Sequence, residues 1–133
     1  MRPTIVLLGT TAVMDAIAAR LKSYGTYEEK DIFDRLSAGD CLFNIDLSGD
    51  VLDDYDDGEL QDLAISSEDL GAILIEYQSV SCIRKLVLTV ISEQDGFLDT
   101  NHGRIIAFDE VRNRFDREPD WDWRRSTRSS KRS

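Results

Sequence analysis

Carboxylates are the most abundant side chains in this chain that could do chemistry, and they gather in one stretch. Between Leu36 and Ile83 there are twelve acidic residues and no lysine or arginine, although the whole 133-residue chain has a net charge of only −10. Crowded like charges repel one another, and contact with a basic partner would offset that cost. The stretch therefore predicts a protein-binding surface, with Tyr55 as an aromatic anchor. Its candidate contact residues are Asp50, Asp53, Asp54, Tyr55, Asp56, Asp57, Glu59 and Asp62.

The same aspartates suggest a calcium loop, because Ca²⁺ prefers oxygen ligands at alternating loop positions. With Gly58 at the sixth position of an EF-hand loop, Asp53 takes the first position, but Tyr55 and Ala64 fall at the third and twelfth. Two ligand positions therefore fail. One histidine and two separated cysteines also cannot supply a zinc site. We expect no metal and no cofactor.

His102 is the only histidine and is the natural candidate for acid–base catalysis. Asp99, Thr100 and Asn101 lie beside it, and a histidine bonded to a carboxylate is the minimum of a catalytic base pair. However, Asn101-His102-Gly103 is also typical of a hairpin turn, in which these residues serve the backbone. We therefore predict no catalytic residue and no enzyme. A small enzyme with a carboxylate or His102 site stays open as an alternative.

Two kinds of phosphate recognition are disfavoured by the sequence. Gly9-Thr10-Thr11 follows an apolar run, but a dinucleotide or P-loop site needs more glycines than this single one. The body of the chain is acidic and would be repelled by nucleic acid, so direct nucleic-acid binding is not expected. We interpret the glycine and threonines as a tight turn and a helix cap.

The apolar pattern predicts an α/β fold: a single domain with a mixed β-sheet flanked by helices, opening with a strand–helix unit. The domain is expected to cover residues 1–123, and residues 124–133 are expected to form a disordered basic tail. Trp121 and Trp123 are expected to pack back on the body. Strands are predicted over 3–8, 41–47, 72–77, 85–91, 97–100 and 104–106, with 72–77 antiparallel to 85–91 and a hairpin of 97–100 with 104–106. Helices are predicted over 11–24, 28–37, 58–67 and 108–115, with a loop over 48–57 and Pro119 ending the last helix.

Cys41 and Cys82 both have apolar neighbours, which favours buried thiols over a disulfide. No apolar run approaches the length needed to cross a membrane, and the N-terminus lacks the features of a signal peptide. We therefore expect a cytoplasmic protein that makes no membrane contact.

Three motifs in the C-terminal part are similar to short bacterial immunity proteins: Phe97-Leu98-Asp99-Thr100-Asn101-His102-Gly103-Arg104, Phe108-Asp109-Glu110 and Pro119-Asp120-Trp121-Asp122-Trp123. The small acidic chain as a whole resembles the immunity proteins of contact-dependent growth inhibition and other polymorphic toxin systems. The resemblance implies that the chain binds a cognate toxin domain, often a basic nuclease, and blocks its active site or substrate surface. A DNA mimic or a regulatory adaptor for another basic protein is the alternative with the same acidic face.

Overall fold

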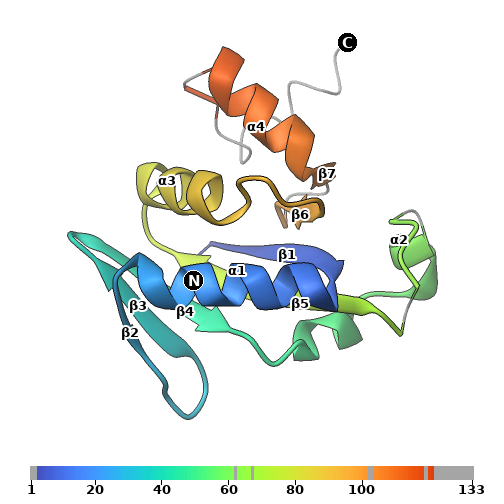
Figure 1. Ribbon diagram of the computed structural model, residues 1–133, viewed down its shortest axis with the longest axis horizontal. Coiled ribbons are helices and arrows are strands. Elements are labelled where there is room, and N and C mark those ends of the chain that lie inside the picture. Colours follow the sequence, from blue (N-terminus) through green and yellow to red (C-terminus); the bar gives the residue numbers. More distant parts are fainter. Residues whose placement is uncertain (1–2, 62, 67, 102–103, 119, 122–133) are drawn as a thin grey trace.

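The computed structural model describes residues 3–61, 63–66, 68–101, 104–118 and 120–121. Within these residues the chain forms one seven-stranded sheet in the order β2-β3-β4-β5-β1-β6-β7, and every neighbouring pair is antiparallel (Figure 1). The strands are β1 (Thr4–Thr10), β2 (Thr26–Glu28), β3 (Asp34–Ala38), β4 (Cys41–Asp46), β5 (Leu70–Tyr77), β6 (Phe97–Asp99) and β7 (Ile105–Ala107).

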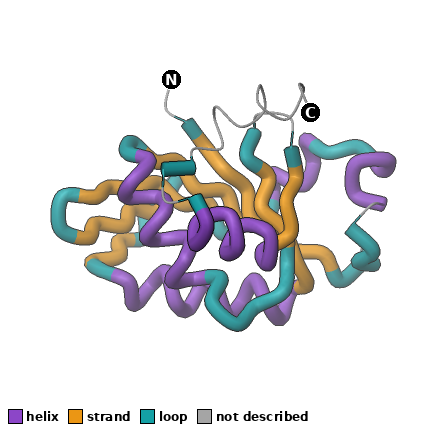
Figure 2. Tube along the Cα trace, turned by 90° about the horizontal axis from the view of Figure 1, so that it is seen from above, coloured by secondary structure: helices purple, strands orange, loops and turns teal. Residues whose placement is uncertain are grey.

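The longer helices cover one face of this sheet, which we call the first face. They lie above and in front of the strands in Figure 1 and across them in Figure 2. The opposite, second face is covered by the segment between β4 and β5. The helices are α1 (Thr11–Tyr24), the 3₁₀ helix η1 (Asp50–Asp54), α2 (Asp57–Gln61), α3 (Val80–Val90) and α4 (Phe108–Arg117).

The predicted α/β class is therefore confirmed, including the opening strand–helix unit. The strand directions differ from the expected mixture, because every described pairing is antiparallel. β1 lies in the interior of the sheet between β5 and β6, and its central residues are buried on both faces. This explains its continuous apolar run, since a strand covered on both sides needs no polar alternation.

The helix predicted after β1 is also confirmed. Thr10 caps α1, because its hydroxyl accepts a hydrogen bond from the Val13 amide at 3.2 Å. Met14, Ile17 and Leu21 are the buried positions. Gly25 follows the helix, and a Cβ built at this position would lie 2.3 Å from the carbonyl oxygen of Ser37. The chain can leave α1 this close to β3 only because residue 25 has no side chain.

The helix predicted over residues 28–37 is wrong, because this region forms β2, a loop and β3. Leu36 is buried in β3 opposite Phe43 of β4, whereas Ile32 is 82% exposed in the loop. The strands β3 and β4 are joined by Gly39 and Asp40 alone, and Gly39 has φ +60°. A two-residue hairpin loop favours positive φ, and glycine adopts it without steric cost.

The strand predicted over residues 85–91 is wrong as well, and so is its antiparallel pairing with residues 72–77. Residues 80–90 form α3, which Ser79 caps by accepting a hydrogen bond from the Cys82 amide at 3.3 Å. The run of β-branched residues suggested a strand, but tertiary packing overrode that propensity. The helix buries a stripe with helical spacing against the first face: Ile83, Leu86, Val87 and Val90.

The remaining strand and helix predictions agree with the structure within a few residues. Residues 41–47 and 72–77 correspond to β4 and β5, β6 and β7 form the expected hairpin, and α4 buries Phe108, Val111 and Phe115. Trp121 packs against Phe115 with ring centroids 5.1 Å apart. The loop expected over 48–57 contains η1, and the short helix expected over 58–67 is limited to α2. Pro119, Trp123 and the predicted tail lie outside the described residues.

Cys41 and Cys82 form a disulfide, which corrects the prediction of two buried thiols. The bond joins the first residue of β4 to the first turn of α3 and closes a loop with a sequence separation of 41 residues. Sequence spacing could not show this pairing, because β4 and α3 approach one another only in the folded chain. The described part of the chain contains no helix that is long and apolar enough to cross a membrane.

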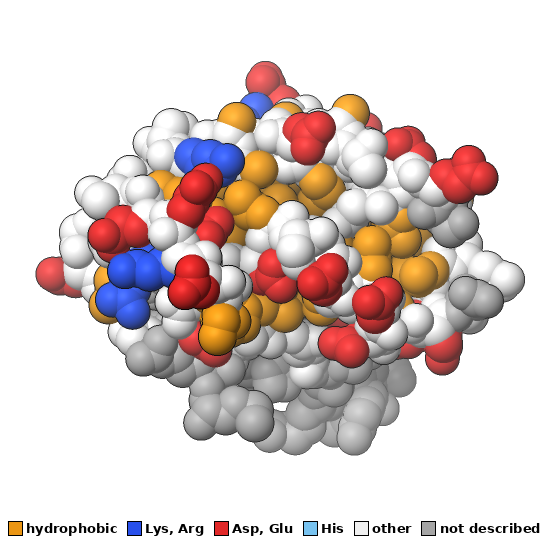
Figure 3. All heavy atoms as spheres, turned by 90° about the horizontal axis from the view of Figure 1, so that it is seen from below, with side chains coloured by type: hydrophobic (Ala, Val, Ile, Leu, Met, Phe, Trp, Pro, Cys, Tyr) orange, Lys and Arg blue, Asp and Glu red, His pale blue; other side chains and the backbone are white. Residues whose placement is uncertain are grey.

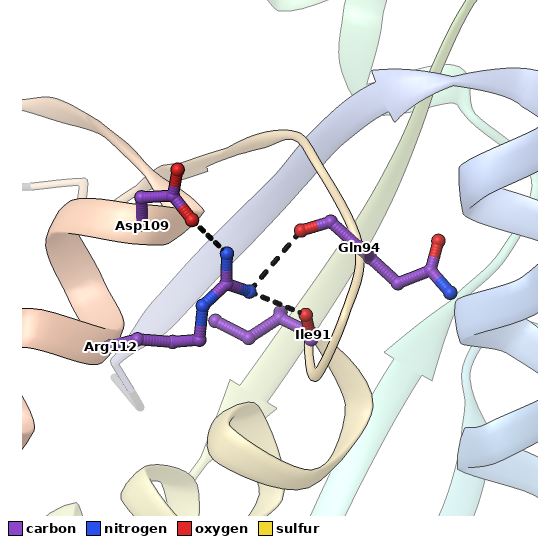
Figure 4. Close-up of polar contacts among 4 residues, drawn as sticks. All are labelled: Ile91, Gln94, Asp109 and Arg112. Carbon is purple, nitrogen blue, oxygen red and sulfur yellow. Dashed lines mark hydrogen bonds and ion pairs between the residues drawn. The ribbon is translucent and has the colours of Figure 1, made fainter.

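Two arginines hold the C-terminal end of α3. Arg112 of α4 donates hydrogen bonds to the carbonyl oxygens of Ile91 at 2.7 Å and Gln94 at 3.2 Å, and it also pairs with Asp109 (Figure 4). Arg20 of α1 donates to the carbonyl oxygens of Val90 at 3.0 Å and Ser92 at 2.5 Å. Carbonyl groups at a helix C-terminus lack partners within the helix and carry partial negative charge, so cations stabilise them.

Candidate acidic binding surface

The candidate surface lies on the segment between β4 and β5. Gly49 begins the turn into η1 with φ +84°, and the short helix then presents Asp50, Asp53 and Asp54 to solvent. Asp56 and Glu59 are exposed at the start of α2. The structure thus brings five of the predicted acidic contact residues together in the one segment between β4 and β5. We call this group of five carboxylates the acidic cluster.

Apolar residues of the same segment explain why the carboxylates point outward. Val51, Leu52, Tyr55, Leu60 and Ile65 pack against the second face of the sheet, around the buried Leu63. The strands contribute a small core of their own on that face: Val6, Leu8, Leu70 and Ala72. Because one side of η1 and α2 is occupied by this packing, the acidic side chains alternate onto the solvent side.

Asp56 and Glu59 fix the start of α2 through a reciprocal pair of hydrogen bonds. The Glu59 amide donates to Oδ1 of Asp56 at 2.8 Å, and the Asp56 amide donates to Oε1 of Glu59 at 3.0 Å. This is the capping-box arrangement, in which each side chain satisfies a backbone N–H that the helix leaves free. Both carboxylates keep their exposure, so they hold the segment in shape while contributing charge to the surface.

Tyr55 connects the acidic cluster to the sheet. It is only partly exposed, and its hydroxyl donates a short hydrogen bond to Oδ2 of Asp99 in β6. Burial is the largest cause that raises the pKa of Tyr55 above its ordinary value, followed by the bond to Asp99 and the charges of Asp99, Glu59 and Asp54. Tyr55 therefore stays a neutral phenol that fixes the segment, with one edge left for contact with a partner.

Within the described residues, the side chains of Asp50, Asp53 and Asp54 form no ion pair with a lysine or arginine. Figure 3 shows the side onto which η1 projects, with carboxylates spread among hydrophobic patches and few basic side chains in view, most of them at the left. The side chain of Asp57 and the whole of Asp62, which belong to the predicted set, lie outside the described residues.

The neighbours of His102 serve the β6–β7 hairpin. Asn101 has φ +62°, its amide donates to Oδ1 of Asp99 at 2.8 Å, and its side chain donates to Oγ1 of Thr4 at 2.5 Å. Thr100 is fully buried. His102 itself lies outside the described residues. In the part of the chain that the structure describes, no group of three or more His, Cys, Asp or Glu residues could hold a metal ion.

Two apolar hollows near the β6–β7 hairpin were not expected from the sequence, and one of them reaches the acidic cluster at Glu59. One of about 350 Å³ is lined by Glu59, Leu63, Phe97 and Ile105. The other, of about 460 Å³, is also lined by Phe97 and lies between Ile65 and the start of α4. Both depend on contacts between β6, β7 and the segment around α2, which no local pattern encodes. The signal that could have pointed to them is the pair of apolar residues on the outer hairpin, Phe97 and Ile105.

No protein family model, curated protein or solved structure matches this chain.

Proposed function

We propose that this chain is an immunity protein that binds a cognate toxin domain, a basic nuclease, and covers its active site or substrate surface with the acidic cluster. The observation that carries the proposal is the group of five exposed carboxylates, which the apolar packing of the same segment holds outward and three of which, Asp50, Asp53 and Asp54, form no ion pair among the described residues. A nuclease binds phosphates through lysine and arginine. A rigid array of carboxylates offers those cations the charge that nucleic acid would otherwise supply.

The packing of the segment supports a binding role. The capping box at Asp56 and Glu59 and the hydrogen bond from Tyr55 to Asp99 limit the motion of the acidic cluster before a partner arrives. A surface that is ordered in advance loses less conformational entropy on binding. Complementary charge also raises the association rate, and this effect weakens as salt screens it. The protein in this proposal acts by contact alone, as a stoichiometric inhibitor with no catalytic step.

The proposal places the protein in the cytoplasm, where a nuclease toxin meets its substrate. Cytosolic thiol systems keep most cysteines reduced. Cys41 and Cys82 are both packed against the first-face core, and we expect this core to keep the chain folded in the dithiol form. The acidic cluster lies on the other face, so the binding surface does not depend on the oxidation state of the two cysteines.

The test is a pull-down with the full chain as bait, washed at low and then at moderate salt, followed by an activity assay of the retained protein. The proposal expects one basic protein that survives moderate salt, cleaves nucleic acid when free, and loses that activity when one equivalent of the chain is added. The triple variant Asp50→Asn/Asp53→Asn/Asp54→Asn is expected to associate more slowly. Asp116→Asn is the matched control, because Asp116 is an exposed acid of α4 outside the cluster. Many basic proteins lost together as salt rises would contradict the proposal.

A further inference from the structure

The outer edge of β7 carries main-chain groups that no described strand pairs. The Thr100 amide donates to the Arg104 carbonyl at 3.0 Å, and the Phe108 amide donates to the Gly96 carbonyl at 2.9 Å. Inward hydrogen bonds alternate along an antiparallel pair, so Ile106 faces β6 in the same way. The N–H and C=O of Ile105 and the N–H of Ala107 must therefore point away from the sheet.

Both apolar hollows are lined in part by residues of β7. The hollow of about 350 Å³ includes Ile105 in its lining, and the hollow of about 460 Å³ includes Ala107. Phe97, opposite Ala107 in β6, lines both. Side chains two residues apart on a strand share a face. A strand added beside β7 would consequently place two of its side chains, two residues apart, toward these two hollows.

The chemistry of the hollows favours one kind of side chain. Apolar side chains line both, with Leu63 in one and Ile65 in the other, and acidic residues are part of each lining: Glu59 in the first, and Asp95 and the Arg112-paired Asp109 in the second. Lysine and arginine have apolar stems that lie along hydrophobic surface and charged ends that reach beyond it. A hollow lined by both apolar and acidic residues fits such a side chain.

We infer that β7 receives an extended basic segment of the partner as an added strand, with lysine or arginine at two positions two residues apart. This inference rests on the proposed function, because it takes the partner to be basic. Main-chain hydrogen bonds to Ile105 and Ala107 would supply part of the affinity, and the hollows would select the alternate side chains, as in other cases of strand addition. The added strand would also cover an edge that otherwise invites uncontrolled pairing.

Ala107 allows a specific test. Its φ of −62° already matches proline, and its N–H points outward, so Ala107→Pro removes one edge donor without breaking a bond inside the sheet. Ala107→Ser retains the donor and is the matched control. The probe is the peptide acetyl-Thr-Arg-Thr-Arg-Thr-amide, titrated into the ¹⁵N-labelled full chain and followed by NMR. We expect shifts centred on Ile105 and Ala107 and an affinity that falls about fivefold or more in Ala107→Pro but not in Ala107→Ser.

Charge and main-chain pairing can be tested separately. Glu59→Gln keeps an acceptor for the capping box but removes the charge, so it should weaken binding of the arginine peptide while the amide spectrum elsewhere stays unchanged. The same peptide N-methylated at both arginines keeps its charge but loses two N–H donors, and it should bind at least fivefold more weakly. Equal affinities for Ala107→Pro and Ala107→Ser, or for the methylated and unmethylated peptides, would overturn the inference.

Two further outcomes separate this inference from its rivals. A dimer of the chain that is lost in Ala107→Pro, with no effect of the peptide, would assign the edge to a second copy and overturn the basic-segment inference. The toxin recovered in the pull-down provides the other comparison. Weaker toxin binding in the triple acidic variant but unchanged binding in Ala107→Pro would overturn only this inference. Unchanged binding in the triple variant would overturn the acidic cluster as the contact surface, whereas a pull-down that retains no basic nuclease would overturn the proposed function.

Discussion

The hydroxyl of Tyr55 donates to the carboxylate of Asp99, and this hydrogen bond fastens the acidic segment to the outer part of the sheet. The two residues are 44 positions apart. Asp99 also accepts from the Asn101 amide, so one carboxylate organises both the acidic segment and the β6–β7 hairpin. The candidate acidic cluster and the two hollows therefore share a support, and a change at one is expected to reach the other.

Tyr55→Phe should destabilise the fold by about 1–2 kcal/mol, because Oδ2 of the partly buried Asp99 loses the hydroxyl donor while Oδ1 keeps the Asn101 amide. Denaturant unfolding of the two proteins measures this difference. Tyr24→Phe is a suitable control, since Tyr24 packs at the edge of the other core and the exchange again removes only a hydroxyl. Equal losses in the free energy of unfolding of both variants would mean that the Tyr55–Asp99 hydrogen bond does not stabilise the fold.

Alkaline pH should reveal the same hydrogen bond. The pKa of Tyr55 is raised above its ordinary value of 10.0, so above about pH 10 the unfolded chain releases the phenol proton while the folded chain retains it. The contribution of the protonated Tyr55 phenol to the free energy of unfolding is complete below pH 10 and is lost as the pH rises further. The wild type should therefore lose stability with pH more steeply than Tyr55→Phe. Tyr27, whose pKa is also raised by burial and by Asp34, is common to both proteins and cancels in the comparison. Parallel curves would contradict the prediction.

The sequence predicted elements whose pattern fits one structure better than elements whose pattern fits two. The run around Ile5 to Leu8 has only one compatible environment, a strand buried on both faces, and the structure places it there. Residues 85–91 were ambiguous, because their β-branched side chains fit a strand while Ile83, Leu86, Val87 and Val90 fit a helix. The capping residue Ser79 favoured the helix. A two-residue Gly39-Asp40 turn would likewise have favoured a hairpin over the helix predicted before it.

The charge of the candidate site could be predicted from the sequence, but most of its geometry could not. Charge is a property of composition, so the acidic segment could be found from the residues alone. Its geometry could not, because the capping box is local but the Tyr55–Asp99 bond and the hollows beside Phe97 join segments that are distant in the chain. The disulfide is a third case of this kind, since Cys41 and Cys82 meet only after β4 and α3 are in place.

Reduction of the disulfide should lower the stability by about 2–4 kcal/mol without unfolding the chain, because the crosslink closes a loop with a sequence separation of 41 residues and limits the unfolded state. The free energy of unfolding with and without a thiol reductant measures the loss. The double variant Cys41→Ser/Cys82→Ser should match the reduced wild type and should not respond to the reductant. An unchanged free energy of unfolding of the wild type in the presence of the reductant would show that the crosslink does not stabilise the fold.

Neutralising the acidic cluster should stabilise the isolated protein slightly. The triple variant Asp50→Asn/Asp53→Asn/Asp54→Asn removes exposed like charges that have no basic partner among the described residues, and the gain should be about 0.5 kcal/mol at low salt. The gain should shrink at high salt, because screening already weakens the repulsion. Thermal unfolding at both salt concentrations measures it. A loss of stability in the triple variant, relative to Asp116→Asn, would mean that the carboxylates serve the fold rather than a partner.

Arg112→Met should destabilise the protein by about 2 kcal/mol. It keeps an apolar stem of similar length but loses the charged hydrogen bonds to the carbonyl oxygens of Ile91 and Gln94 at the end of α3 (Figure 4). Arg117→Met is the control, because the only described bond of Arg117 is a 3.4 Å contact with Asn113 in its own helix. Chemical unfolding of both variants should show a clearly larger loss in the free energy of unfolding for Arg112→Met than for Arg117→Met.

A double-mutant cycle with Arg20→Met extends this test. Arg20 and Arg112 come from different helices, but both donate to carbonyl oxygens within residues 90–94. Once one arginine is removed, that end of α3 can shift and offers the other a poorer geometry. The double variant should therefore lose less stability than the sum of the single losses, by about 0.5 kcal/mol or more. Strict additivity would show that the two arginines act on separate, rigid parts of the turn, and that α1 and α4 are joined to α3 independently.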